Sequence, residues 1–175
     1  TFVEMGSDLI FGDLIFGPGI PIALRSLKSL EMVARLAAPI ITKLPFEFIY
    51  PTGSKQDEVK LSHKYKRYYQ KADIIAGDFH FIKKYIPDNL SGKIIITNTV
   101  TETDIKDLKK RHLDRLVTTT PELNGRSFGT NVMEAVLVAL SGKGMQKLTT
   151  RDYLKLLNKI NFTPRIIEMS DYNST

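Results

Sequence analysis

The chain lacks cysteine entirely, and this absence removes several kinds of chemistry at once. Without a thiol there is no disulfide, no thiolate nucleophile and no cysteine-ligated metal. The sequence also lacks any run of about 18 uninterrupted apolar residues, so it predicts neither a membrane-spanning helix nor a membrane partner. A cysteine-free chain of this composition fits the cytoplasm, and we predict that location.

The composition is that of a globular protein. Of the 175 residues, 42% are hydrophobic and 25% are charged, a length and balance that predict a single domain over residues 1–175. The formal net charge of +6 favours anionic partners, which include nucleotides, carboxylate metabolites and nucleic acid. The charge alone does not choose among them, and a positive charge spread evenly over the surface is the alternative.

The first residues resemble the end of a helix followed by a strand. Gly6 suits the position just after a helix, where glycine adopts the left-handed conformation at low cost. Residues 8–12 form an apolar run that Asp13 closes, which indicates a buried strand. We therefore expect a fold that lacks its first strand and helix in this chain, which would be truncated at the N-terminus.

Downstream, short apolar runs alternate with helical patterns. Strands are predicted at 46–50, 73–77, 93–97, 115–119 and, at the edge of the sheet, 165–169. Helices are predicted at 22–43 (mostly buried, and kinked or divided at Pro39), within 55–71, near 80–86, and at 102–111, 132–140 and 150–160. We expect caps at Thr101, at Thr130 or Asn131, and at Thr149 or Thr150. This order predicts an α/β, Rossmann-like fold whose mostly parallel sheet has helices on both faces.

Asp13 is the first candidate functional residue. In dinucleotide-binding folds an acid at the end of the second strand hydrogen-bonds the ribose hydroxyls. Such a carboxylate would repel a 2′-phosphate, which favours NAD over NADP as the cofactor. The segment from Gly17 to Gly19 does not replace the glycine fingerprint, because the third glycine is missing. The alternative is that Asp13 ends a strand in solvent.

A second candidate follows the strand predicted at 73–77. Open α/β sheets bind ligands just beyond the carboxyl ends of their strands, where Asp78 could orient His80 as an acid or base. The alternative is that Asp78 caps a helix whose first turn exposes His80. One histidine and one aspartate do not make a metal ligand set, so no metal site is predicted.

The third candidate is the loop that leads into the apolar helix. Its backbone, short polar groups and one guanidinium suit a phosphate or carboxylate at a helix start. We predict an anion site made by Gly125, Arg126, Ser127, Gly129, Thr130 and Asn131. Other strand ends supply further candidates for cofactor contact, namely Thr97, Asn98 and Thr118. The alternative is an ordinary capped loop.

Residues 55–71 interleave lysines with tyrosines. Aromatic side chains among cations can bind nucleic acid, but no recognised nucleic-acid motif accompanies them. A solvated helix whose tyrosines pack on one face is the more usual structure, so we do not expect a nucleic-acid partner.

Five segments carry a family resemblance: 12–17, 24–27, 50–53, 72–81 and 118–135. Together they resemble bacterial proteins, frequent in Firmicutes, that are labelled quinate or shikimate 5-dehydrogenase-like. The similarity covers nearly the whole chain, and segment 118–135 is the most specific to the group. It implies an NAD(P)-binding Rossmann-like fold. Quinate and shikimate dehydrogenases transfer a proton through a Lys–Asp pair in a separate N-terminal domain, and no such pair is found here.

Two functions follow as expectations. In the first, the chain is the cofactor-binding portion of an NAD(P)-dependent oxidoreductase that acts on a hydroxy acid, with the hydride chemistry supplied by the cofactor. In the second, it is a non-catalytic module that binds a nucleotide or metabolite, since a fold alone does not establish an activity. Both imply a small anionic metabolite or a dinucleotide as the ligand, and both are compatible with a homo-oligomer.

Overall fold

The computed structural model describes residues 2–16, 19–20, 22–45, 63–144 and 147–172. The chain divides into two compact units. One unit comprises Thr1–Tyr69 with His80–Ile86, and the other comprises Gln70–Phe79 with Pro87–Thr175. Each is described separately below, and the single domain expected over residues 1–175 stays a prediction.

The first unit is helical, and aromatic side chains form its centre. Its elements are α1 (Asp13–Phe16), α2 (Leu27–Ile41), most of α4 (His63–Lys71) and most of α5 (Phe79–Tyr85). The Phe16 ring lies 5.4 Å from the rings of both Tyr69 and Tyr85, centroid to centroid. Tyr69 is buried and its hydroxyl donates a 2.9 Å hydrogen bond to the Ile82 carbonyl. The tyrosines of the Lys/Tyr stretch therefore pack inward, as the sequence predicts.

The strand predicted at residues 8–12 is wrong. This segment makes one isolated antiparallel bridge, between Phe11 and Leu24, and does not join the sheet. Asp13 does not end a strand; it begins α1, where a carboxylate suits the positive end of the helix dipole. Residues 2–6 form a turn, and Gly6 has the expected positive φ, at 70°.

The helix α2 is present but differs from the prediction in two respects. It begins after Ser26, which forms a reciprocal capping box with Ser29, and it continues undivided through Pro39. No residue of α2 is buried, although the sequence predicts a mostly buried helix. An apolar periodicity identifies the face of a helix that avoids water, but it does not identify a partner. The strand predicted at 46–50 lies outside the described residues.

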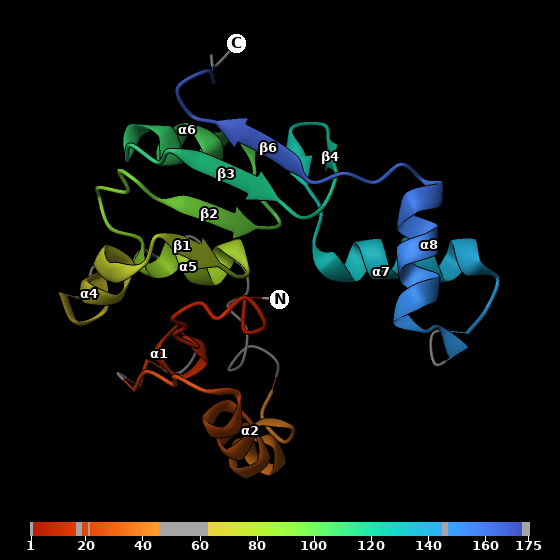
Figure 1. The fold of residues 1–175 in the computed structure, drawn as a ribbon, viewed down its shortest axis with the longest axis horizontal. Helices are drawn as coiled ribbons and strands as arrows, with labels where there is room; N and C mark the ends of the chain where they lie inside the picture. Colours follow the sequence, from red (N-terminus) through yellow and green to blue (C-terminus); the bar gives the residue numbers. More distant parts are fainter. Residues whose placement is uncertain (1, 17–18, 21, 46–62, 145–146, 173–175) are drawn as a thin grey trace. The chain divides into compact units, whose positions relative to one another are not determined.

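The second unit contains a four-stranded sheet (Figure 1). The strand order is β1 (Ile74–Ala76), β2 (Ile94–Thr97), β3 (Arg115–Thr118) and β6 (Arg165–Glu168). The first three strands are parallel, and β6 is antiparallel to β3. Short apolar strands separated by α-helical connections are typical of such a sheet. The α/β class, the mostly parallel sheet and the edge strand are therefore confirmed.

The two faces of the sheet differ in burial. The register aligns Ile75, Ile95, Leu116 and Ile167 in one row, and the last three of these are buried. Side chains alternate between faces, so the next residues along each strand point the other way. There Ile74 and Ile166 are exposed, and Ile96 and Val117 are only partly covered. Cover by helices on both faces was expected, but among the described residues one face is buried and the other is largely open.

Three helices and a hairpin complete the second unit. The helix α6 (Glu102–Lys110) begins with the capping box that was predicted from Thr101 and Asp104, and it buries Ile105 and Leu108. Strands β4 (Glu122–Leu123) and β5 (Arg126–Ser127) form a two-stranded hairpin. The helices α7 (Thr130–Ser141) and α8 (Thr150–Lys159) contact each other. The predicted cap of α8 at Thr149 is confirmed, as is the helix near 80–86, which is α5.

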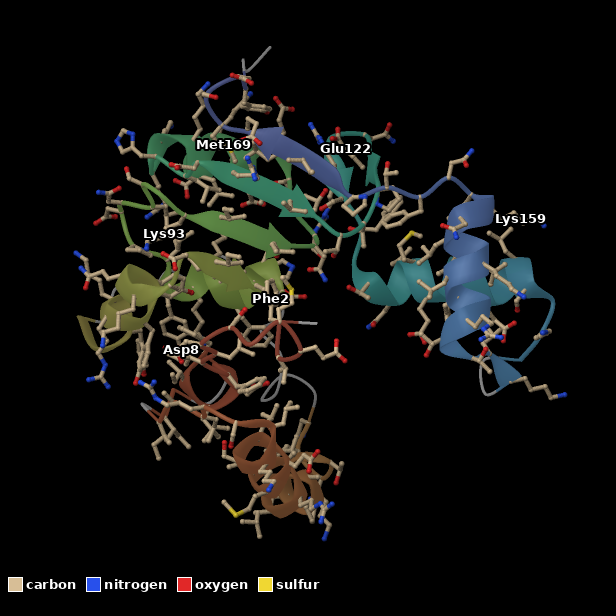
Figure 2. All side chains as sticks on the ribbon, in the orientation of Figure 1. Phe2, Asp8, Lys93, Glu122, Lys159 and Met169 are labelled. Carbon is tan, nitrogen blue, oxygen red and sulfur yellow. The ribbon has the colours of Figure 1, made fainter. Side chains whose placement is uncertain are left out.

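The direction of the strands defines the two edges of the sheet. Figure 2 labels Lys93 and Met169 at the edge where β2 and β3 begin, and Glu122 toward the edge where they end. The ammonium of Lys93 donates to the carbonyls of Gln70 and Ala72, which fixes the start of β1. No helix in the described part of the chain is long and apolar enough to cross a membrane.

Candidate functional site

The carboxyl ends of β1, β2 and β3 meet at one edge of the sheet, and hydrogen bonds join them. The Thr97 hydroxyl donates to the Gly77 carbonyl over 2.6 Å, which ties β2 to β1. The Thr119 amide donates to the Thr97 carbonyl over 2.8 Å, which ties β3 to β2. The expectation that these strand ends lie together is confirmed. The Thr97 hydroxyl, however, is occupied by the backbone.

Thr118, the last residue of β3, differs from its neighbour in the register. Thr97 and Thr118 are aligned partners and point to the same, buried face. Thr118 is 1% exposed, and its hydroxyl has no hydrogen-bond partner in the structure. A buried hydroxyl without a partner has lost its hydration and gained nothing in return, so each such group calls for an explanation. A bound ligand is one explanation, because it can supply the missing partner.

The start of α7 is held against the end of β2. The Asn98 side-chain amide donates a 2.8 Å hydrogen bond to the Thr130 hydroxyl, and the Thr99 amide donates to the Phe128 carbonyl over 3.2 Å. The N-cap of α7 is Gly129, not Thr130 or Asn131 as predicted, and no side chain caps it. The side chain that could have capped the helix is paired with Asn98 instead. The start of this 12-residue helix is thus open to an external acceptor.

Thr99 has a strained backbone. Its φ is +54°, which is rare for any residue with a side chain and a genuine outlier for a β-branched one. Its hydroxyl donates to the Asn98 side-chain oxygen over 3.2 Å. Strain of this kind persists where surrounding contacts enforce it, and it concentrates at binding sites. It draws attention to the β2 end independently of Thr118.

The sequence Asn124–Gly125 forms the turn of the β4–β5 hairpin. Both residues have positive φ, 52° and 76°, which is the conformation of the two-residue turn that Asn-Gly favours. The sequence reasoning treated this segment as a loop and missed the hairpin, although the dipeptide is a strong signal for one. The hairpin is bonded to the start of α6, because the Glu102 amide donates to the Gly125 carbonyl.

The structure divides the predicted anion site in two. Ser127 is buried, and its hydroxyl accepts a 2.7 Å hydrogen bond from the Val100 amide, so its role is structural. Gly125 lies near a carboxylate, since a Cβ on it would be 3.8 Å from Glu102 Oε2. Arg126 is exposed on the hairpin. The helix-start residues Gly129, Thr130 and Asn131 therefore remain the better place for an anion.

The proposed Asp78–His80 pair is divided by the boundary between the two compact units. Asp78 follows β1 in the second unit, and His80 lies in α5 as part of the first. Both side chains are partly buried, and each makes an interaction within the structure. Among the described residues there is no group of acids and histidines that could hold a metal ion.

Asp13 lies in the first unit, while the strand ends form part of the second. Its proposed contact with ribose depended on a position at the end of a strand, and that position is incorrect because Asp13 begins α1. The preference for NAD over NADP depended on the same carboxylate and loses its basis. Sequence reasoning could not foresee this, because an apolar run that ends in glycine and aspartate is equally compatible with a loop before a short helix.

An open cavity of about 430 Å³ lies at the opposite edge of the sheet. It is lined by Lys109, His112, Leu113, Asp114, Glu168, Met169 and Ser170. Its lining mixes both signs of charge, and it borders the start of β3. Ligands of open α/β sheets bind at the carboxyl ends of the strands, so we give this cavity less weight.

The comparisons with known proteins identify a family but no activity. No curated protein and no solved structure is significantly similar to the chain. The model of a family described as a domain of unknown function, DUF8754, matches residues 1–169, and the chain therefore belongs to that family.

Proposed function

We propose that the chain binds a dinucleotide or another small anionic metabolite at the carboxyl ends of β1, β2 and β3. The observation that carries the proposal is the Thr118 hydroxyl, which is buried at this edge without a partner. A ligand oxygen next to it would remove the cost of that unmade hydrogen bond. The uncapped start of α7, held at the end of β2, supports an anionic group on the ligand.

The more specific form of the proposal is the cofactor-binding part of an NAD(P)-dependent oxidoreductase with a Rossmann-like fold. Its support is the parallel sheet, together with the resemblance carried by segments 72–81 and 118–135. The groups that join the strand ends, Thr97, Asn98 and Thr99, are hydroxyls and an amide. Such groups position a ligand but do not titrate near neutral pH, so the redox step would depend on the cofactor.

A non-catalytic binding module is the second candidate, and the position of the only proposed acid–base pair favours it. Asp78 and His80 belong to different units, and no Lys–Asp pair like that of the dehydrogenases is identified. The strand-end site accounts for binding without either residue. The two candidates share a ligand site and differ only in whether turnover follows.

Isothermal titration calorimetry of the full chain with NAD⁺, NADH, NADP⁺ and NADPH tests the proposal. We expect at least one to bind, and we expect Thr118→Val to weaken that binding at least tenfold. Arg151→Gln, an exposed change on α8, is the control and should bind as the original chain does. If none of the four binds, and inorganic phosphate and citrate do not bind either, the proposal is wrong.

A spectrophotometric assay separates the two candidates. Reduction of the bound nucleotide in the presence of quinate or shikimate, followed at 340 nm, would establish the oxidoreductase. Binding without turnover would support the module instead. Turnover that persists undiminished in Thr118→Val would contradict the site, because the reaction would then take place elsewhere.

A further inference from the structure

The second unit exposes two apolar surfaces that the proposed ligand site does not use. The first is the open face of the sheet, where Ile166 is 63% exposed and Ile74 is 42% exposed, next to the partly covered Ile94, Ile96 and Val117. The second is a stripe on α7. Contiguous exposed apolar surfaces of this kind mark sites of protein association.

The stripe on α7 consists of Val132, Val136 and Leu140. These residues are four apart and therefore lie along one side of the helix. They are 49%, 42% and 53% exposed, whereas Met133 and Leu137 on another side are buried. The helix thus has two apolar sides, and the part of the chain that the structure describes covers one of them.

The two surfaces match each other in charge. On the open face Arg115 and Glu168 are paired at 2.6 Å and neutralise each other. The only charged residue of α7 is Glu134, two residues along the helix from Val132 and so on another side. Neither surface places an unpaired charge opposite the other, as the core of a stable interface requires.

The start of α7 is fixed at the end of β2 by the Asn98–Thr130 and Thr99–Phe128 hydrogen bonds. With these bonds made, neither the stripe nor the open face is buried by the other within the chain. A second copy can bring its stripe to the open face without breaking them. A twofold axis then forms the same contact twice, since the sheet of each copy receives the helix of the other.

We infer that two copies of this chain associate through the α7 stripe of one and the open sheet face of the other. Each contact would remove on the order of 500 Å² from water, and the symmetric pair about 1,000 Å², which is the lower limit for a specific interface. Because the ligand site includes the start of α7, the two sites of such a dimer would adjoin its interface. This inference is independent of the proposed function, since it depends on apolar surfaces alone.

Light scattering during size-exclusion chromatography is the first test. We expect the chain to be a dimer at ~50 µM and each of Val136→Lys and Ile166→Lys to be a monomer with an unchanged circular-dichroism spectrum. Leu36→Lys, on the exposed side of α2, is the matched control and should remain a dimer. The inference is overturned if the original chain is monomeric at this concentration, or if both lysine variants remain dimeric.

Cross-linking distinguishes a second copy from closure of α7 on its own sheet. The absence of native cysteine allows single thiols to be placed without background. Val136→Cys mixed with Ile166→Cys should give cross-linked dimers with a short bismaleimide, whereas Leu36→Cys mixed with Ile166→Cys should not. If the double variant carrying both Val136→Cys and Ile166→Cys instead cross-links within one chain at high dilution, the second-copy inference is wrong.

Discussion

The side-chain amide of Asn98 donates a 2.8 Å hydrogen bond to the hydroxyl of Thr130 and so joins the end of β2 to the first residue of α7. The two residues are 32 positions apart in the sequence. Sequence reasoning assigned one to cofactor contact and the other to an anion site, and the structure brings them together. This bond makes the strand ends and the helix start a single candidate site.

Removing the Asn98 amide should release the start of α7. We expect Asn98→Ala to lower the free energy of unfolding by about 1 kcal/mol and to speed amide exchange over residues 130–133. Asn98→Asp is the matched variant, because the Thr130 hydroxyl can donate to the new carboxylate and preserve the link. Hydrogen exchange followed by mass spectrometry measures both. Equal exchange in the original chain and in Asn98→Ala would show that the bond does not fix the helix.

The aligned residues Thr97 and Thr118 should respond oppositely to the same substitution. Thr97→Val removes the hydroxyl that donates to Gly77 and should cost about 1 kcal/mol of stability. Thr118→Val removes a hydroxyl with no partner and replaces it with a methyl of similar size. We expect the ligand-free Thr118→Val protein to be as stable as the original or more stable, as measured by urea denaturation. A large loss of stability in Thr118→Val would mean that its hydroxyl has a partner in the protein.

The strain at Thr99 predicts a stabilising substitution. Asparagine tolerates a positive φ better than threonine does, so Thr99→Asn should raise the free energy of unfolding by about 1 kcal/mol. Thr99→Val keeps the β-branch and the strain, and should give no such gain. Thermal unfolding of the two variants provides the comparison. If Thr99→Asn is no more stable than Thr99→Val, the backbone at this position is not under strain.

The strands of the second unit could be predicted because their sequence is nearly self-sufficient. Runs such as Ile94–Thr97 and Arg115–Thr118 are apolar and short, and sequence separations suitable for helices lie between them, so a parallel sheet is the natural solution. The caps at Thr101 and Thr149 were predictable for the same reason, since the partner lies three residues away. From this order followed the correct expectation that the strand ends meet.

The features that could not be predicted depend on distant partners. Asp13 follows an apolar run like those of the true strands, but no neighbouring strand pairs with that run beyond the single Phe11–Leu24 bridge. Thr130 has the right residue type for a cap, but Asn98 competes for its hydroxyl from another strand end. Thr97 and Thr118 occupy equivalent positions in sequence, and only the coordinates show that one hydroxyl is paired and the other is not.

The capping box of α8 predicts a dependence of stability on acid. The amide and hydroxyl of Thr149 donate to the Asp152 carboxylate, and these hydrogen bonds lower the pKa of Asp152 below its ordinary value. A group whose pKa is lower in the folded state stabilises that state above the pKa of the unfolded chain, ~3.9 for aspartate. The contribution is lost as the pH falls through the lower, folded-state pKa.

We therefore expect the start of α8 to lose protection from amide exchange as the pH is lowered from 5 to 2. Asp152→Asn should show little further loss over this range, because its side chain does not titrate, and Asp171→Asn near the C-terminus should behave as the original chain does. An NMR titration of the Asp152 carboxyl gives the direction of the shift directly. A pKa at or above the unfolded value would contradict the capping role, since the Thr149 donors would then favour the charged form no more than water does.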